Sequence, residues 1–455
     1  MIRDGRILAW SLLLLVAGAL ALRALAMWLG ALLSGGPVLY GEGAVAHAGQ
    51  ILARGGDPYA LETDGGFVAA NYPPLAFAVG ALGSALGPFV GLRLAGICAT
   101  LAVAFAAARL AGFGVAGVAL GVSWVALFPV EIWGAAVKPD PLAVALTAFA
   151  VIAAGQSRTR AGLAGVLAAL AILAKPTAAL PLAALAVYLA VRERPTLLRA
   201  AMTCGLTLAA ALALVVARSG LEGPLEHVVR RNALGFSVEA LSGLIVVGIL
   251  SLGASALLAA RVAEGRFRAY LIGATAVILL GGREGATINY LLDFGAASTL
   301  ALAASAGTLR TYAPLAIAAQ LALAVLVFHP FEPAATTGAW GDPRRSEQTA
   351  NLGPLSRSLA EDSGVLVANG IEPEVDDLFL WARLVTNGSL RDQLTARVRS
   401  GEFTSVFSEV DLSALDSAPA YERQRWIPPL VSAMLETYRL DSIHRGLYRY
   451  ALRPR

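Results

Sequence analysis

Long apolar segments follow one another through the first 328 residues of this chain, and they constrain its fold more than any other feature. Runs of roughly 17–25 apolar residues are the sequence signature of membrane-spanning helices. The chain is 57% hydrophobic and only 15% charged, in keeping with many such helices. The sequence therefore predicts a polytopic integral membrane protein. Its first segment is too long for the core of a signal peptide and lacks a clear cleavage site, so we expect a retained helix.

Twelve apolar segments can be delimited. They comprise residues 7–29, 73–91, 94–109, 115–130, 141–155, 161–174, 176–191, 198–217, 240–260, 269–281, 286–306 and 311–328. The second segment differs from the others because it opens with NYPPL and is interrupted by GALGSALG. These features are typical of a helix that lies in, or dips into, the outer interface instead of crossing the bilayer.

The basic residues between these segments predict the topology. The candidate inner loops are MIRDGR at the start, 157–160, 192–195, 261–268 and the turn at Arg310. If all twelve segments crossed, the first two of these loops would lie on opposite sides, against the tendency of basic loops to stay in the cytoplasm. If segment 73–91 does not cross, all five loops are cytoplasmic. We therefore expect an all-α bundle of about eleven crossings plus interfacial helices in the cytoplasmic (inner) membrane, with a cytoplasmic N-terminus.

The C-terminal part has a different composition. Residues 330–455 hold 17 of the 31 acidic residues and 14 of the 35 basic ones, which leaves a basic excess in residues 1–329. Local patterns predict strands at 364–370, 403–410 and 446–452, and helices in DDLFLWARLV and PLVSAMLETYRL. We expect a transmembrane domain at 1–329 and a small soluble α/β domain at 330–455, on the extracytoplasmic side.

Several functional classes are not indicated. Cys98 and Cys204 both fall in apolar segments, which suggests neither a disulfide framework nor a metal site. The arginines are dispersed between apolar segments, so nucleic-acid binding is not expected. The C-terminal part contains no glycine-rich phosphate loop, Ser-His-Asp order or Cys/His metal spacing.

The chain has only two lysines, Lys138 in VKPDP and Lys175 in AKPTA, and both lie at the predicted outer face. Their positions have structural explanations. Asp140 can cap the helix that starts at Pro141 with Lys138 as its counter-charge, and Lys175 can complement a helix dipole. The choice of lysine in an arginine-rich chain is not explained in this way. Lysine is a compact charge that binds phosphate or carboxylate without a planar partner, so we predict a polar cavity with an anionic occupant.

Glu42 opens the first outer loop, in GEGAVAHAGQILARGGDPY. A carboxylate at the start of a long ordered loop is a candidate general base. The alternative is a solvated loop acid or a charge that stabilises the start of a helix. His47, one turn further along, is more typical of an interfacial polar residue than of a ligand.

Two further outer stretches carry charged candidates. EHVVRRNALGFS contains Arg230 and Arg231, and GGREGATINYLLDF contains Arg283 and Glu284, which can alternatively form a local ion pair of little energetic consequence. Asp293 falls inside an apolar segment, where an acid is usually functional or paired.

In their order and approximate spacing, GEGAVAHAGQILARGGDPY…NYPPLAFAVGAL, VKPDPLAVAL, LAKPTAALPLAAL, EHVVRRNALGFS and GGREGATINYLLDF resemble the GT-C superfamily of membrane glycosyltransferases. The resemblance is to the branch that includes protein O-mannosyltransferases and the aminoarabinose transferases of lipid A. It covers about residues 1–310, and the acidic tail looks like the extracytoplasmic domain that many such enzymes carry. The family often has two adjacent acids, or an Asp, where this chain has a lone Glu between glycines.

The resemblance implies a polyprenyl-phosphate-linked sugar donor, transfer at the outer face, Glu42 as the catalytic base and Asp140 as a second catalytic acid. The residues expected to bind the donor phosphate are Lys138, Lys175, Arg230, Arg231 and Arg283. Those expected to bind substrate are Asn71, Tyr72, Glu284, Asn289 and Tyr290. No metal ligand is predicted and no cofactor is required; a divalent cation is compatible with the site but not indicated.

The predicted function is therefore a glycosyltransferase whose partners are a polyprenyl-phosphate sugar donor, a glycan, lipid or protein acceptor, and membrane lipids. A transporter or flippase of lipid-linked sugars is the first alternative. Transporters tend to show internal repeats and broken helices in matching halves, and the chain has no convincing repeat. The second alternative is a non-catalytic membrane subunit whose tail recruits partners.

Overall fold

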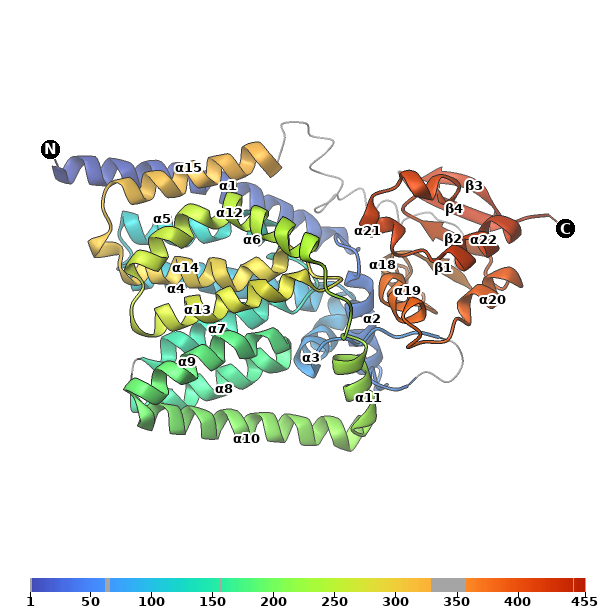
Figure 1. Ribbon diagram of the computed structural model, residues 1–455, viewed down its shortest axis with the longest axis horizontal. Helices are drawn as coiled ribbons and strands as arrows, with labels where there is room; N and C mark the ends of the chain where they lie inside the picture. The colour runs from blue at the N-terminus through green and yellow to red at the C-terminus, as the bar shows by residue number, and fades with distance from the viewer. Residues whose placement is uncertain (1, 62–65, 156, 329–356, 445, 455) are drawn as a thin grey trace.

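The protein forms a helical bundle with a smaller α/β unit packed on one end, in a computed structural model that describes residues 2–61, 66–155, 157–328, 357–444 and 446–454 (Figure 1). We call residues 357–454 the C-terminal unit and the end of the bundle that it covers the capped end; the other end, where the chain begins, is the open end. The predicted boundary between residues 329 and 330 lies outside the described residues.

The apolar segments fold into helices. The bundle and its connecting loops contain α1 (Ile2–Ser34), α2 (Glu42–Ala53), α3 (Pro74–Gly83), α4 (Val90–Leu110), α5 (Val115–Val125), α6 (Phe128–Trp133), α7 (Asp140–Ala154), α8 (Arg158–Ala174), α9 (Ala179–Arg192), α10 (Arg194–Ser219), α11 (Glu222–Pro224), a π-helical turn (Leu225–Arg230), α12 (Val238–Val262), α13 (Gly265–Leu279), α14 (Leu292–Ala304) and α15 (Tyr312–Phe328). Among the described residues, four helices (α1, α4, α10 and α12) are long and apolar enough to cross a membrane by length and composition alone.

Helix α3 is about half as long as α4, the helix that follows it. It has 10 residues and is followed by a 3-10 turn at Ser84–Leu86, where the GALGSALG sequence was expected to break it. At 1.5 Å per residue, such a helix is about 15 Å long, roughly half the hydrocarbon thickness of a bilayer. The helix thus ends at the glycine-rich sequence that was expected to interrupt it.

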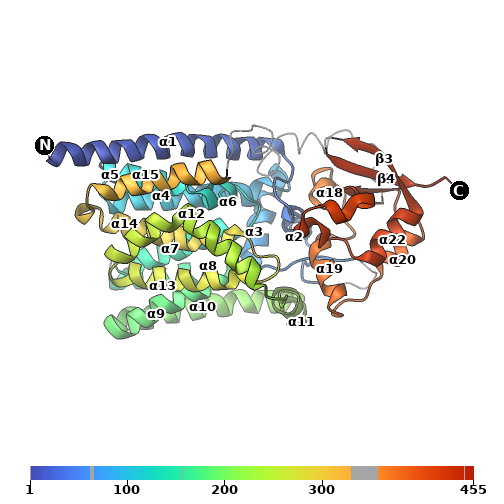
Figure 2. The ribbon, with the colours of Figure 1, turned by 45° about the horizontal axis from the view of Figure 1, so that its top comes forward.

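Small residues allow the helices to approach closely. A Cβ added to Gly165 of α8 would lie 2.0 Å from the carbonyl oxygen of Ala200 in α10, and one added to Gly273 of α13 would lie 2.3 Å from the Cα of Pro181 in α9. Close backbone approach of this kind is how helices associate in lipid, where the hydrophobic effect does not drive them together. Helices α1 and α15 lie side by side at one edge of the bundle and α10 lies at another (Figures 1 and 2).

The five basic loops lie together at the open end. Arg6 donates hydrogen bonds to the carbonyl oxygens of Ala306 (2.9 Å) and Gly307 (3.0 Å), and the side chain of Arg266 lies against Gly155. The helices between these loops run to the capped end and back (Figure 2). The loops that precede α2, α7 and α14 consequently lie at the opposite end, next to the C-terminal unit.

The C-terminal unit is built around a four-stranded sheet of order β1-β2-β4-β3. It contains β1 (Ser358–Ala360), α18 (Gly364–Ala368), α19 (Leu378–Thr386), α20 (Leu394–Arg399), β2 (Ser405–Ser408), α21 (Ala420–Arg423), α22 (Pro428–Thr437), β3 (Tyr438–His444) and β4 (Leu447–Leu452). Strand β1 pairs with β2 in parallel, and the other two pairs are antiparallel. Helices α19 and α22 and strands β2 and β4 coincide with predicted elements.

Two local predictions in this unit differ from the structure, one in the type of element and one in its C-terminal boundary. Residues 364–370 were expected to form a strand, but they contain the short helix α18. A run of a few apolar residues does not distinguish a strand from a buried helix by periodicity, and here Asp362 accepts a hydrogen bond from the first helical amide, that of Gly364 (3.0 Å). The helix predicted in PLVSAMLETYRL ends at Thr437, and its last three residues begin β3.

Candidate active site

Asp140 lies at the capped end, as the first residue of α7. It is 1% exposed, and its Oδ1 accepts hydrogen bonds from Lys175 Nζ and from Asn289 Nδ2, the latter at 2.7 Å. Its Oδ2 is buried and makes no hydrogen bond with the described residues. The helix-capping role considered for Asp140 is not observed, because α7 has no side-chain cap hydrogen bond. Instead the carboxylate joins the ends of three helical segments.

The two lysines take different positions around this carboxylate. Lys175 is buried, pairs with Asp140 and places its Nζ 4.4 Å from the centre of the Tyr290 ring. Lys138 is half-buried; its Nζ donates to the carbonyl oxygen of Gly41 at 2.8 Å and lies 6.0 Å from the centre of the Tyr72 ring. The counter-charge of Asp140 is therefore Lys175, not Lys138 as the sequence suggested.

Tyr72 lies near both Lys138 and Asp140. Burial raises the pKa of its phenol well above the ordinary value, and the nearby Asp140, Tyr290 and Asp377 raise it further. The phenol therefore stays neutral and can donate a hydrogen bond. Its main-chain carbonyl accepts a hydrogen bond from the Tyr59 hydroxyl at 2.7 Å, which fixes the segment before α3.

Glu42 is fully buried, and both oxygens of its carboxylate accept hydrogen bonds. Its Oε2 accepts hydrogen bonds from Arg93 Nη2 and from the amide of Val38, and its Oε1 accepts from the amide of Val137, all at 2.8 Å. A carboxylate enclosed in this way has no face to offer a substrate hydroxyl. The geometry thus gives no support to the predicted role of Glu42 as the catalytic base. It supports a positioning role, because Glu42 ties the end of α1 to the loop that carries Lys138.

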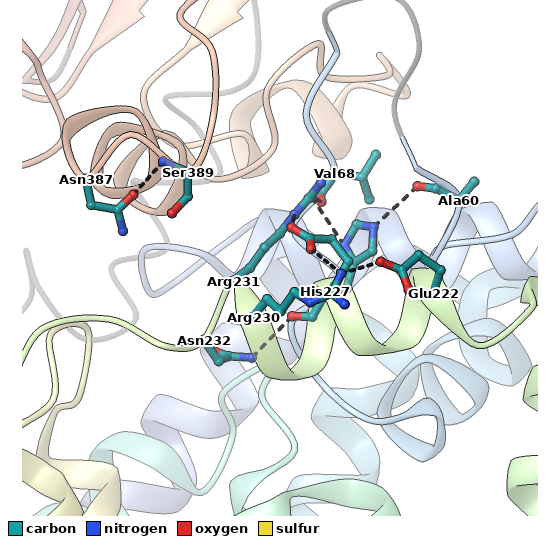
Figure 3. A network of polar contacts seen from close by, with 10 residues as sticks. Ala60, Val68, Glu222, His227, Arg230, Arg231, Asn232, Asn387 and Ser389 are labelled. Atoms are coloured by element: carbon teal, nitrogen blue, oxygen red, sulfur yellow. Dashed lines mark hydrogen bonds and ion pairs between the residues drawn. The ribbon is translucent and has the colours of Figure 1, made fainter.

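Arg230 and Arg231 make no hydrogen bond or ion pair with Asp140, Lys175 or Asn289 among the described residues. Arg230 is exposed and pairs with Glu222 and Glu226 of its own helical turn. Arg231 is buried, donates to the carbonyl oxygen of Val68 at 2.9 Å and holds the first outer loop against this turn (Figure 3). The expectation that both bind the donor phosphate has no support from these contacts.

Three predicted site residues remain to be described: Arg283, Glu284 and Asn71. Arg283 is half-buried, and its side chain makes no hydrogen bond or ion pair with the described residues. Glu284 forms an ion pair with Arg383 of the C-terminal unit, in which Oε1 and Nη1 are 3.7 Å apart. Arg283 and Glu284 therefore do not form the local ion pair considered from the sequence. Asn71 is held through its main-chain carbonyl by Asn232 (2.8 Å).

Asp293 lies inside the bundle in α14, where its Oδ1 accepts a hydrogen bond from the Tyr270 hydroxyl at 3.1 Å. It is thus paired, as expected for an acid inside an apolar segment. Among the described residues, no group of three or more His, Cys, Asp or Glu side chains is placed to hold a metal ion.

Sequence reasoning missed two residues that the structure brings to this region. Arg93 lies between two predicted apolar segments, and an arginine at the predicted outer face was a usable signal. Asp377 belongs to the C-terminal unit, and its sequence context indicates only the start of an amphipathic helix. Nothing in the local sequence shows that this helix starts beside Gly41.

A membrane-embedded helical bundle with an α/β unit over a cluster of lysines and carboxylates is the architecture expected from the GT-C resemblance. The same fold is found in two solved structures of ArnT from Cupriavidus metallidurans. One is bound to undecaprenyl phosphate (TM-score 0.62) and the other is in the apo state (TM-score 0.60); each is 14% identical over 95% of this chain and 97% of that chain. The predicted resemblance to the aminoarabinose transferase branch is thereby confirmed for the fold. No protein-family model and no curated protein matches the sequence.

Proposed function

We propose that this protein is a multi-pass membrane glycosyltransferase that moves a sugar from a polyprenyl-phosphate donor to an acceptor hydroxyl at the outer face of the cytoplasmic membrane. The observation that carries the proposal is the position of the chain's two lysines, both at the capped end and both within electrostatic reach of Asp140. The fold shared with ArnT bound to undecaprenyl phosphate supports the same class of donor. The basic loops at the open end favour a cytoplasmic N-terminus, with the C-terminal unit outside.

The donor phosphate would be held by Lys138 and Arg283. An ammonium has three N–H donors, and Lys138 uses one of them on the carbonyl oxygen of Gly41. The Arg283 side chain makes no hydrogen bond or ion pair with the described residues, so its guanidinium is available at the same end of the bundle. Both cations would stabilise the negative charge that develops on the phosphate as the sugar leaves. This chemistry uses no cofactor.

Asp140 would orient the substrate. Lys175 neutralises its charge and Asn289 fixes its plane, so that only Oδ2 remains to accept a hydrogen bond. A buried carboxylate oxygen without a partner is unfavourable unless a ligand supplies one. A hydroxyl group of the bound sugar, or of the glycan, lipid or protein acceptor, would supply it here.

Donor binding is tested with undecaprenyl phosphate as the probe and purified full-length protein in lipid nanodiscs. A charge-assisted hydrogen bond contributes about 1.5–3 kcal/mol, so Lys138→Ala should weaken binding about tenfold or more. Arg399→Ala, at an exposed position of the C-terminal unit, should bind like the wild type. Failure of the wild type to bind the probe in native mass spectrometry would contradict the proposal.

Transfer is tested in proteoliposomes with a panel of undecaprenyl-phosphate-linked sugars, by measuring whether the sugar leaves the lipid phosphate. We expect cleavage of at least one donor when an acceptor-containing membrane extract is present. Movement of an intact donor across the bilayer without cleavage would instead indicate a transporter of lipid-linked sugars.

A further inference from the structure

The C-terminal unit places a carboxylate in the proposed site, next to a glycine that has no side chain of its own. Gly41 immediately precedes Glu42 and has a φ of +74°, a conformation that favours glycine. A Cβ added to Gly41 would lie 2.9 Å from Lys138 Nζ and 3.7 Å from Asp377 Oδ2. The ammonium group and the carboxylate therefore face the same small space, although they form no direct ion pair within the described residues.

The two oxygens of Asp377 have different surroundings. Oδ1 accepts hydrogen bonds from the amide of Leu380 (2.9 Å), as the N-cap of α19, and from the Tyr40 hydroxyl (3.2 Å). Oδ2 makes no hydrogen bond with the described residues, and the side chain is half-buried. One oxygen thus fixes the carboxylate while the other is directed toward Gly41 and Lys138. This is the arrangement that a proton acceptor needs, and Glu42 does not have it.

Docking of the C-terminal unit holds Asp377 in place relative to the bundle. The amide of Phe67 donates to the carbonyl oxygen of Glu374 (2.8 Å), and the amide of Asp376 donates to that of Phe67 (3.1 Å). The amide of Phe379 donates to the Tyr40 hydroxyl at 2.8 Å. These bonds flank Asp377 on both sides in sequence, so its carboxylate is fixed against the first outer loop.

Tyr40 is itself clamped by the C-terminal unit. The guanidinium carbon of Arg425 lies 3.8 Å from the centre of the Tyr40 ring, and the same guanidinium pairs with Glu361 and Glu409, each at 2.7 Å. Besides capping α19, Asp377 thus contacts a bundle residue that is itself anchored. The contacts therefore indicate a role for Asp377 beyond the folding of α19.

From this geometry we infer that Asp377, supplied by the C-terminal unit, is the catalytic base of the transfer proposed above, on which the inference rests. Its Oδ2 takes the proton of the acceptor hydroxyl as the acceptor oxygen forms a bond to the anomeric carbon. The bond between that carbon and the phosphate oxygen breaks, and its electron pair leaves with the polyprenyl phosphate. Lys138, on the other side of the same space, binds the phosphate that carries the new charge.

The simplest alternative is that Asp377 only caps α19. Asn and Ser serve as N-caps about as well as Asp, so Asp377→Asn and Asp377→Ser preserve the cap while they remove the proton acceptor. Asp411 provides a matched control, because it also caps a helical turn of the C-terminal unit, through the amide of Ser413 at 2.9 Å, but lies outside the site. Asp411→Asn should therefore leave transfer unchanged.

The experiment uses full-length protein in nanodiscs and two readouts, undecaprenyl phosphate binding and sugar transfer from the donor panel. We expect Asp377→Asn to reduce transfer at least a hundredfold while the affinity for undecaprenyl phosphate rises severalfold, because an anion facing the phosphate site is removed. Asp377→Glu should recover part of the transfer rate. Transfer by Asp377→Asn within threefold of the wild type would overturn the inference, and so would a parallel loss of probe binding and transfer.

The two readouts also separate this inference from the proposed function. If the wild type binds undecaprenyl phosphate but transfers from no donor, the proposed function fails together with the catalytic role of Asp377. In that case, undecaprenyl phosphate binding alone still tests whether Asp377 lies beside the phosphate site. Tighter binding by Asp377→Asn, but not by Asp411→Asn, supports this placement, and equal binding by both variants contradicts it.

Discussion

The guanidinium of Arg93 and the carboxylate of Glu42 form an ion pair in which Nη2 and Oε2 are 2.8 Å apart and both side chains are fully buried. Arg93 also donates to the carbonyl oxygens of Ala31 (2.7 Å), Gly36 (3.2 Å) and Ala135 (3.0 Å). One arginine of α4 thus fixes the end of α1 and the loop before α7. The path of the chain around Gly41 and Lys138 depends on this pair.

Disruption of the pair should destabilise the protein whichever partner is changed. Removal of one partner from a buried ion pair costs about 3–5 kcal/mol, because the other charge remains buried. We expect Arg93→Leu to lower the free energy of unfolding by about this amount, and Glu42→Gln to lower it substantially by turning an amide donor toward Arg93 or a main-chain amide. Thermal or denaturant unfolding in detergent measures both losses.

The exposed Glu264→Gln, at the open end, is the control and should change stability by less than about 0.5 kcal/mol. A Glu42→Gln protein with wild-type stability and no transfer would instead show that Glu42 is the base and that its positioning role is wrong.

Gly43 of α2 should be indispensable for docking of the C-terminal unit. A Cβ at this position would lie 2.1 Å from the amide nitrogen of Gly364 and 2.4 Å from Ser363 Oγ. Main-chain atoms cannot yield as a flexible side chain can, and overpacking of this kind costs about 1–3 kcal/mol. We expect Gly43→Ala to accelerate hydrogen exchange of the α18 amides about tenfold or more.

Gly18→Ala is the matched control for this prediction, because nothing lies within 4 Å of a Cβ at that position in α1. Unchanged exchange in α18 of Gly43→Ala would mean that the close approach of α2 and α18 is not required for docking.

The helices and the grouping of the basic loops follow from features that are local in sequence. Apolar segments become helices because main-chain hydrogen bonds must be satisfied inside a bilayer, and the positions of arginines between them indicate which loops share an end. The interruption of the second apolar segment by glycine is visible as the short α3. The two lysines were expected at one face because each lies next to the end of an apolar segment, and both lie at the capped end.

The roles of individual carboxylates could not be predicted from the sequence. Glu42 looks like a free acid at the start of a loop, and only the fold brings Arg93, 51 residues away, to occupy it. Asp377 reads as a helix cap, and only docking of the C-terminal unit brings it to Gly41. Availability of a carboxylate depends on which donors tertiary structure places around it, and these donors come from distant segments.

The Asp140–Lys175 pair should behave as a coupled unit. Lys175→Met leaves the buried Asp140 carboxylate without its counter-charge and should cost about 3–5 kcal/mol. Asp140→Asn introduced into the Lys175→Met protein should recover part of that loss, because a neutral amide needs no counter-ion. A double-mutant cycle of unfolding free energies measures the coupling. Lys138→Met, which removes a hydrogen bond to a carbonyl oxygen but no salt bridge among the described residues, should cost about 1 kcal/mol. Strictly additive losses for the Asp140 and Lys175 variants would contradict the pairing.

Docking of the C-terminal unit should weaken as pH rises, because of Asp376. This side chain is 1% exposed; its Oδ2 lies 3.1 Å from His47 Nδ1 of α2, and its Oδ1 accepts from the amide of Ala69 at 2.7 Å. Burial raises its pKa above the ordinary value of 3.8, and the hydrogen bond with His47 only partly opposes this. The docked state therefore binds more protons than an undocked state between 3.8 and the raised pKa. Stability of docking falls as pH rises through this window.

The measurement is the protection of the α18 amides against hydrogen exchange, corrected for the intrinsic effect of pH, between about pH 4 and pH 7. Asp376→Asn still accepts from Ala69 but does not titrate, so it should remove the decline. Glu372→Gln, at an exposed position 3.7 Å from His47, is the control and should keep the decline. His47→Gln, which removes the side chain that faces Asp376, separates the contributions of the two groups. If the decline persists in Asp376→Asn and disappears in His47→Gln, the histidine and not the buried carboxyl group governs docking.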